Sequence, residues 1–367
     1  MIKKNLKNQN IQNKKNQIKN SKDFKSQLTP KFENLVLDGH EIRQGENIRI
    51  NIDMGSIFDF TEVKMPLQVL SGVNKGPIIF ICSTIHGDEI IGIEIVRRVL
   101  EKLDVKKLSG VVIAIPIVNV FGFNDRSRYL PDRRDLNRCF PGIKNGSLAS
   151  QLAFKFMQEI VVKSNFGIDI HTGAYHRNNL PQIRTNLNSQ INMQLAQAFN
   201  APAIVNSDLR DGSLREAASQ AKIPMVLYEA GEALRFDEEA VEIGVDGIFR
   251  VLAEIGMIEK FTIKKRKDIF VANSSSWIRA SQSGIFIPKA KLGDLVKKGD
   301  ILAEISNPFG DNKVLVKALE DGLIIGTSML PLVNKGDAIF HLGSENYRDN
   351  QNHFESLGID LLNYKHF

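Results

Sequence analysis

The feature that most constrains this chain is an apolar run that ends abruptly in polar residues. Residues 77–85 (PIIFICSTI) fit one strand buried on both faces, and residues 86–89 (HGDE) follow it directly. Over residues 90–103 the apolar positions then recur at helical spacing beside charged ones. The HGDE segment is therefore expected in a strand-to-helix turn at the carboxyl end of a strand, which is where open α/β sheets bind ligands.

This turn carries residue types that bind metal ions. His86 and Glu89 are three residues apart, so one helical turn would place imidazole and carboxylate on the same side. A catalytic zinc usually takes three protein ligands and leaves a position for water, and His-His-Glu is one known set. The third ligand should be a histidine at another strand end, and residues 166–173 (FGIDIHTG) offer His171 there. The alternative is that both are hydrogen-bonded core histidines, but two at strand ends, one with a spaced glutamate, favour the metal site.

Strands and helices alternate along the first two thirds of the chain, which predicts an α/β fold. An apolar strand at residues 110–119 follows the helix at 90–103 and completes a βαβ unit with the first strand. The strand predicted at residues 223–229 ends on a carboxylate, Glu229. Further strands are predicted at residues 34–37, 47–53, 63–70, 166–171 and 203–205, and helices at 147–163, 188–199, 213–222 and 236–255.

From about residue 270 the pattern changes to short strands with frequent glycine and almost no helix. Gly284 and Gly322 begin two similar segments 38 residues apart, which suggests a small pseudo-symmetric β-barrel. We expect this barrel to pack against the α/β domain and to narrow the entrance to its site. The predicted organisation is a disordered basic tail at residues 1–31, an α/β domain at 32–265, a β-barrel domain at 266–345 and a C-terminal tail at 346–367.

The net charge of +6 is confined to the N-terminal segment. Nine lysines and one aspartate fall in residues 1–31, so this segment carries +8 and the other 336 residues carry −2. A solvated tail explains this better than a nucleic-acid partner. The sequence also has no apolar run near the ~20 residues of a membrane helix, no hydrophobic signal region and only two cysteines. We therefore expect a cytoplasmic protein without a nucleic-acid or membrane partner.

A long polar loop between residues 119 and 148 carries five arginines and no apolar period. Loops of this length in a compact domain usually have a function, and the planar fork of arginine suits a carboxylate. For Arg126, Arg133 and Arg134 a solvated surface position is the favoured interpretation.

Four short motifs resemble the succinylglutamate desuccinylase/aspartoacylase family, which is related to the zinc carboxypeptidases. They are HGDE at residues 86–89, DLNR at 135–138 followed by FPG at 140–142, DIHTG at 169–173 and YEAG at 228–231. The resemblance runs from about residue 45 to 345. It implies a carboxypeptidase-like mixed sheet flanked by helices, with a C-terminal barrel similar to biotinyl and lipoyl domains. The hairpin that carries the modified lysine in such carriers aligns with residues 310–312, where no lysine stands.

The resemblance also implies a role for each matching residue. His86, Glu89 and His171 would hold one zinc, Glu229 would be the general base, Arg128 would face the scissile carbonyl, and Asn137 and Arg138 would hold the substrate carboxylate. Glu232 is interpreted as structural. Asp88 and Asp169 are candidates to orient the ligand imidazoles, with simple turn aspartates as the equal alternative.

The implied activity is zinc-dependent hydrolysis of the amide bond of a small N-acyl amino acid or related compound. A metallocarboxypeptidase that acts on peptide C-termini would use the same residues and remains the alternative. A carrier module built on the barrel is disfavoured by the missing lysine. The acyl group, the amine and the number of subunits, including a homo-oligomer, stay open.

Overall fold

The computed structural model describes residues 26–29, 34–259, 266 and 268–346 of the 367-residue chain. The predicted basic tail at residues 1–31 lies outside the described residues except for 26–29, and the predicted C-terminal tail lies outside them except for residue 346. Within the described part of the chain, no helix is both long and apolar enough to cross a membrane.

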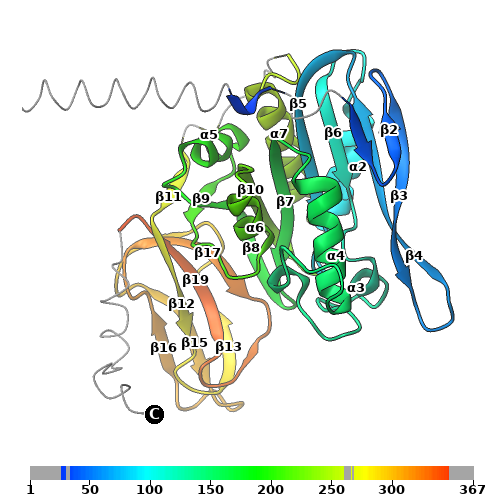
Figure 1. Ribbon diagram of the computed structural model, residues 1–367. Helices are drawn as coiled ribbons and strands as arrows, with labels where there is room; N and C mark the ends of the chain where they lie inside the picture. The colour runs from blue at the N-terminus through cyan, green and yellow to red at the C-terminus, as the bar shows by residue number, and fades with distance from the viewer. Residues whose placement is uncertain (1–25, 30–33, 260–265, 267, 347–367) are drawn as a thin grey trace, which may run out of the picture.

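A large mixed sheet runs through the molecule with the strand order β12-β19-β17-β8-β10-β7-β5-β6-β4-β3 (Figure 1). Its central strands are parallel, since β5 pairs in parallel with β6 and β7, and β7 with β10. These strands are β5 (Asn74–Ser83), β6 (Ser109–Ile115), β7 (Phe166–Gly173) and β10 (Met225–Glu232). β4 (Glu62–Ser71) and β3 (Asn47–Ser56) add antiparallel strands on one side. The predicted α/β class with a mixed sheet is confirmed.

Helices cover both faces of this sheet because the central strands are apolar on both faces. In β5, Ile79 and Ile81 belong to one buried core, whereas Ile78, Phe80 and Cys82 belong to the other. The first core is closed by α2 (Ile91–Lys102), α5 (Gln190–Phe199) and α7 (Glu238–Glu254). The second is closed by α3 (Val120–Asn124), α4 (Leu148–Phe156), the π-helical turn η2 (Met157–Val161) and α6 (Leu214–Gln220), with the short pair β1 (Leu35–Leu37) and β2 (His40–Ile42) beside them.

The C-terminal segment continues the main sheet instead of forming a detached unit. β17 (Gly322–Ser328) pairs antiparallel with β8 (Arg177–Thr185), and β19 (Ala338–Ser344) and β12 (Ser274–Arg279) follow it (Figure 1). A second sheet has the order β16-β15-β13-β18 and encloses a separate apolar core with the first. The remaining strands are β9 (Ala203–Asn206), β11 (Phe270–Ala272), β13 (Gly284–Pro288), β14 (Leu295–Val296), β15 (Ile301–Ser306), β16 (Val314–Lys317) and β18 (Leu332–Val333).

The C-terminal domain is less separate than the sequence predicts, because its strands join the main sheet. Two sheets around one core agree with a small β domain over the predicted residues, but one of those sheets is shared with the α/β domain. The resemblance to biotinyl and lipoyl domains remains a prediction. Because β17 covers part of β8, the C-terminal strands also bring side chains to the edge of the sheet where the candidate site lies.

β8 is a strand that the sequence pattern does not predict. It contains Pro181, which cannot donate to a ladder. β17 pairs with residues 177–179 and β9 pairs with residues 182–185, so Pro181 falls between the two partners on that side of the strand. On the other side it falls in the register shift between β8 and β10. The proline is therefore tolerated inside a sheet because no ladder bond is required of it.

Candidate active site

The site lies where the parallel strands end. β5 stops at Ser83, and its continuation carries His86 and Glu89 into the turn before α2. The Glu89 N–H donates to the His86 carbonyl at 3.0 Å, which confirms the predicted strand-to-helix turn. The turn packs closely on α3, since a Cβ on Gly87 would lie 1.9 Å from the Gly122 carbonyl carbon. Only glycine fits at this position of the HGDE motif.

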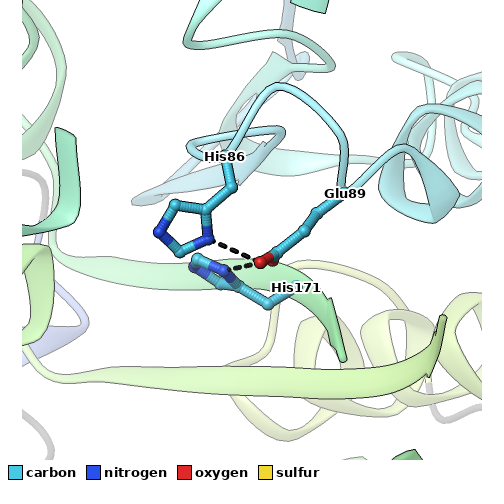
Figure 2. Close-up of side chains that lie close together, drawn as sticks. All are labelled: His86, Glu89 and His171. Atoms are coloured by element: carbon cyan, nitrogen blue, oxygen red, sulfur yellow. Dashed lines mark hydrogen bonds and ion pairs between the residues drawn. The ribbon is translucent and has the colours of Figure 1, made fainter. Parts of the chain in front are cut away.

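The three predicted metal ligands meet at one point, as Figure 2 shows. Glu89 Oε1 lies 2.6 Å from His86 Nδ1, and Glu89 Oε2 lies 2.7 Å from His171 Nδ1. The potential ligand atoms of the three residues all lie within 4.8 Å of one another, and each residue is buried. Two imidazole nitrogens and one carboxylate are a donor set that suits zinc.

Aspartates fix the direction of both imidazole rings. His171 Nε2 is 2.8 Å from Asp169 Oδ2, and His86 Nε2 is 3.1 Å from Asp135 Oδ1. The Nδ1 atoms are thereby left facing inward, which is the arrangement of metal-bound histidines whose second nitrogen donates to a carboxylate. Asp169 therefore lies where it can orient His171, which is one of the two roles expected for it. Beside His86 the orienting aspartate is Asp135 and not Asp88. The Asp88 Oδ1 atom is buried without a hydrogen-bond partner among the described residues.

The carboxylates and imidazoles of this cluster shift one another's pKa. Burial raises the pKa of the Glu89 carboxyl, but the two imidazoles beside it outweigh burial and hold that pKa well below its usual range. Burial likewise opposes the charged form of His171, yet the carboxylates of Asp169 and Glu89 raise its pKa well above the ordinary value. The pocket therefore favours positive charge at the two imidazoles, and a bound cation would take the place of their protons. The residues present fit a zinc ion.

The candidate base stands on the next strand. Glu229 lies directly beside His171 in the parallel pairing of β10 with β7. Its Oε1 atom accepts a hydrogen bond from Asn179 Nδ2 at 2.9 Å, and its Oε2 atom forms an ion pair with Arg184. Glu232 follows a register shift in β10 and sits 3.8 Å from His176 Nδ1, outside the residues that line the cavity. Glu229 is therefore the carboxylate of this strand that faces the cluster.

Two residues of the loop approach the cluster from the side, the predicted Arg128 and the unpredicted Asp135. Arg128 bonds Glu89 Oε1 at 3.1 Å and Asp135 Oδ2 at 2.9 Å, so it reaches the candidate metal site itself. Asp135 also caps the short 3-10 helix η1 (Leu136–Arg138) by accepting from the Asn137 N–H at 2.8 Å. Asp135 thus connects the loop to His86 and caps the start of the short helix that carries Asn137.

Asn137 and Arg138 both line the cavity, as expected for substrate contacts. The Asn137 Oδ1 atom accepts from the Leu214 N–H at 2.9 Å, so the carbonyl of this side chain is engaged in holding α6. The Arg138 Nη1 atom donates a hydrogen bond to the backbone carbonyl of Asn137. Arg126, Arg133 and Arg134 are absent from the described cavity lining, in agreement with their interpretation as surface residues.

A cavity of about 300 Å³ opens over these residues, and its wall is unusually cationic. Trp277 from β12 and the amide of Asn179 also face it. Burial and repulsion by neighbouring arginines lower the pKa of Arg215 to about 10 and also lower that of Arg210. The wall of the cavity therefore carries a high density of positive charge. Its guanidinium groups belong to Arg128, Arg138, Arg177, Arg184, Arg210 and Arg215.

Sequence reasoning missed the part of this wall that comes from β8 and from the segment before α6. Arg177, Asn179 and Arg184 belong to β8, whose polar composition and internal proline hide it as a strand. The signal that was available is the placement of the polar residues Arg177 and Asn179 at alternate positions just after the histidine motif at residues 169–173. For Trp277 there was none, because its position depends on pairing between distant strands.

Comparison with known proteins agrees with the motifs. Residues 75–255 match the succinylglutamate desuccinylase/aspartoacylase catalytic domain. An N-alpha-acetyl-L-2,4-diaminobutyric acid deacetylase from Halomonas elongata is 27% identical over 291 residues, which cover 76% of this chain and 84% of that protein.

Solved structures share the fold at lower identity. A succinylglutamate desuccinylase/aspartoacylase from Rhodobacter sphaeroides aligns with a TM-score of 0.73 and 23% identity, covering 83% of this chain and 98% of that one. The product-bound ectoine utilization protein EutE (DoeB) from Ruegeria pomeroyi aligns with a TM-score of 0.74 and 24% identity over 86% and 98%. Together with the four motifs, this match identifies residues 75–255 as a catalytic domain of the succinylglutamate desuccinylase/aspartoacylase family.

Proposed function

We propose that this protein is a zinc-dependent deacylase that hydrolyses the amide bond of a small N-acyl amino acid. The observation that carries the proposal is the inward convergence of two imidazole Nδ1 atoms and one carboxylate beside Glu229. His86, Glu89 and His171 would hold the ion. A zinc ion in such a site lowers the pKa of bound water towards about 7 and polarises a carbonyl.

The protein groups have separate tasks in this reaction. Glu229 takes the proton of the attacking water and delivers it to the leaving nitrogen, and Asn179 and Arg184 hold its two oxygens in place. Arg128 lies against Glu89, so its guanidinium can also face the oxygen on which negative charge develops. Arg138 and Asn137 stand further along the cavity wall, where the carboxylate of the amino acid would bind.

The charge of the cavity favours acidic substrates. Among the described lining residues the carboxylates are Glu89 and Glu229, and each already contacts cationic or imidazole groups. A cationic side chain such as that of diaminobutyrate would meet six guanidinium groups and no free carboxylate there. We therefore infer a preference for an N-acyl amino acid with a second anionic group, unlike the compound named for the Halomonas elongata relative.

The dimensions of the cavity bear on the alternative, a metallocarboxypeptidase. A volume of about 300 Å³, closed on one side by Trp277 of the C-terminal segment, suits a small molecule better than a peptide chain. Deleting the C-terminal segment is a poor test, because it would uncover the edge of β8 that β17 covers. Trp277→Ala opens the wall without removing a strand.

The test is a panel of substrates with zinc-loaded protein. We expect acid release from N-acyl aspartate or glutamate, slower release from N-acetyl-diaminobutyrate, and no residue release from peptide C-termini. Release of C-terminal residues from peptides at rates above deacylation would replace the proposal with the carboxypeptidase. Faster turnover of the diaminobutyrate compound would overturn the inference from cavity charge while leaving the deacylase intact.

A further inference from the structure

A row of side chains crosses the sheet from the C-terminal strands to the candidate base. Trp277 of β12 pairs with His341 of β19, His341 pairs with Gly326 of β17, and Gly326 pairs with Asn179 of β8. Residues paired in this way across neighbouring strands point to the same face of a sheet. Asn179 is the residue that donates to Glu229 Oε1, so the row ends at the candidate base.

Gly326 leaves the room that this row needs. A Cβ at Gly326 would lie 2.8 Å from Asn179 Oδ1 and 3.0 Å from His341 Cβ. Any larger residue would push one of these two side chains aside. The absence of a side chain at position 326 therefore lets a histidine of the C-terminal segment approach the groups that hold Glu229.

His341 contacts Arg184, the second group that holds Glu229. Its Nδ1 atom lies 3.4 Å from Arg184 Nη2, a long hydrogen bond, while Arg184 forms its ion pair with Glu229 Oε2. The imidazole ring stacks on Trp277 with 4.3 Å between ring centroids and an interplanar angle of 10°. His341 is only 4% exposed, so both contacts are protected from water.

His341 must be neutral to accept a hydrogen bond from Arg184. Burial, together with the positive charges of Arg184, Arg210 and Arg177, lowers the pKa of His341 well below its ordinary value. The neutral ring has one nitrogen that accepts, and a guanidinium only donates, so Nδ1 is the acceptor and Nε2 carries the proton. Arg184 is thus held between a carboxylate and an imidazole that belong to different parts of the chain.

We propose that His341 is a positioning residue for the hydrolytic reaction: by accepting from Arg184 it fixes the guanidinium that holds the Glu229 carboxylate against the site. The C-terminal segment then contributes to turnover as well as to the cavity wall. This inference rests on the proposed function, because it gives Glu229 the role of base. It assigns His341 no contact with substrate or with the reacting atoms.

Three substitutions of His341 separate its role as a hydrogen-bond acceptor for Arg184 from its packing on Trp277. His341→Phe keeps an aromatic ring for the stack on Trp277 and removes the acceptor. His341→Asn removes the ring but places Oδ1 near the position of the imidazole Nδ1. His341→Gln carries the same amide one bond further out, near the position of Nε2, and is the matched control for His341→Asn.

We expect His341→Phe to lower kcat on the order of tenfold, with KM changed by less than about twofold and zinc content unchanged. His341→Asn should recover most of kcat, and His341→Gln should recover less. Near-wild-type kcat in His341→Phe would overturn the proposal. So would a loss in His341→Asn equal to that in His341→Phe, because an acceptor at the position of Nδ1 would then restore nothing.

A second measurement does not depend on activity. The melting temperatures of His341→Phe, Arg184→Met and the double variant should depart from additivity by about 2 °C or more if the two side chains interact. If the wild type hydrolyses no N-acyl amino acid but the coupling is present, the proposed function fails and the contact survives. Additive melting shifts would overturn the positioning role whatever the activity.

Discussion

Replacing Glu229 by glutamine separates its role as a base from its role in the sheet. The amide keeps the size of the side chain, and its oxygen can still accept from Asn179 Nδ2. The amide nitrogen, however, would face Arg184, so a donor would point at a donor. The substitution therefore removes a proton acceptor and leaves a guanidinium without its counter-ion.

Both losses have expected sizes. General base catalysis supplies roughly 10²–10⁴ in rate, or about 2.7–5.5 kcal/mol of activation free energy, so kcat of Glu229→Gln should fall by that factor. Both side chains of the ion pair are only 16% exposed. Loss of one partner should therefore also reduce the free energy of unfolding by about 1–3 kcal/mol.

The assay is steady-state deacylation with zinc-loaded protein, accompanied by metal analysis and thermal unfolding. Glu232→Gln is the matched control, because Glu232 lies on the same strand and is absent from the described cavity lining. Its kcat should stay within about twofold of wild type. If Glu229→Gln kept kcat within threefold with zinc bound, or if Glu232→Gln lost as much, Glu229 would not be the base.

Three further substitutions test separate parts of the account. Arg138→Ala should raise KM and cost about 2–5 kcal/mol in kcat/KM, with little further loss when the substrate carboxylate is replaced by an amide; Arg126→Ala, outside the described cavity lining, should change neither, and simply additive effects would exclude the clamp. Asp169→Asn should weaken zinc about 10–100-fold in a chelator competition, because Asp169 orients His171; unchanged affinity would contradict that role. Glu94 is bonded to Arg97 and Arg98, and these bonds lower its pKa to about 2. Its contribution to stability is present above the unfolded value near 4.5 and is lost as pH falls towards 2, so denaturant unfolding of Glu94→Gln and wild type should differ at pH 7 and converge near pH 2.

The sequence allowed prediction of the parts of the site that local patterns encode. His86 and Glu89 share one turn after a buried strand, and His171 ends another strand, so their meeting follows from the parallel order of β5 and β7. Glu229 follows in the same way from β10. Spacing and strand ends are short-range signals, and parallel packing places such ends at one edge.

The rest of the site depends on pairing between segments far apart in the chain. Arg184 lies on a polar strand whose proline is tolerated only because its neighbours leave a gap there. His341 reaches Arg184 because β19 and β17 continue the main sheet, and no periodicity near residue 341 signals that continuity. Asp135 orients His86 across a loop without regular structure, so spacing alone pointed to Asp88 instead.

The central claim is that His86, Glu89 and His171 form a zinc site. Zinc content measured by atomic emission after dialysis, on wild type and on His171→Ala prepared in parallel, tests it most directly. We expect one zinc per chain in the wild type and loss of most of it in the variant, with Arg126→Ala retaining the full amount. A wild type that binds no zinc, or a folded His171→Ala that keeps its full complement, would contradict the account.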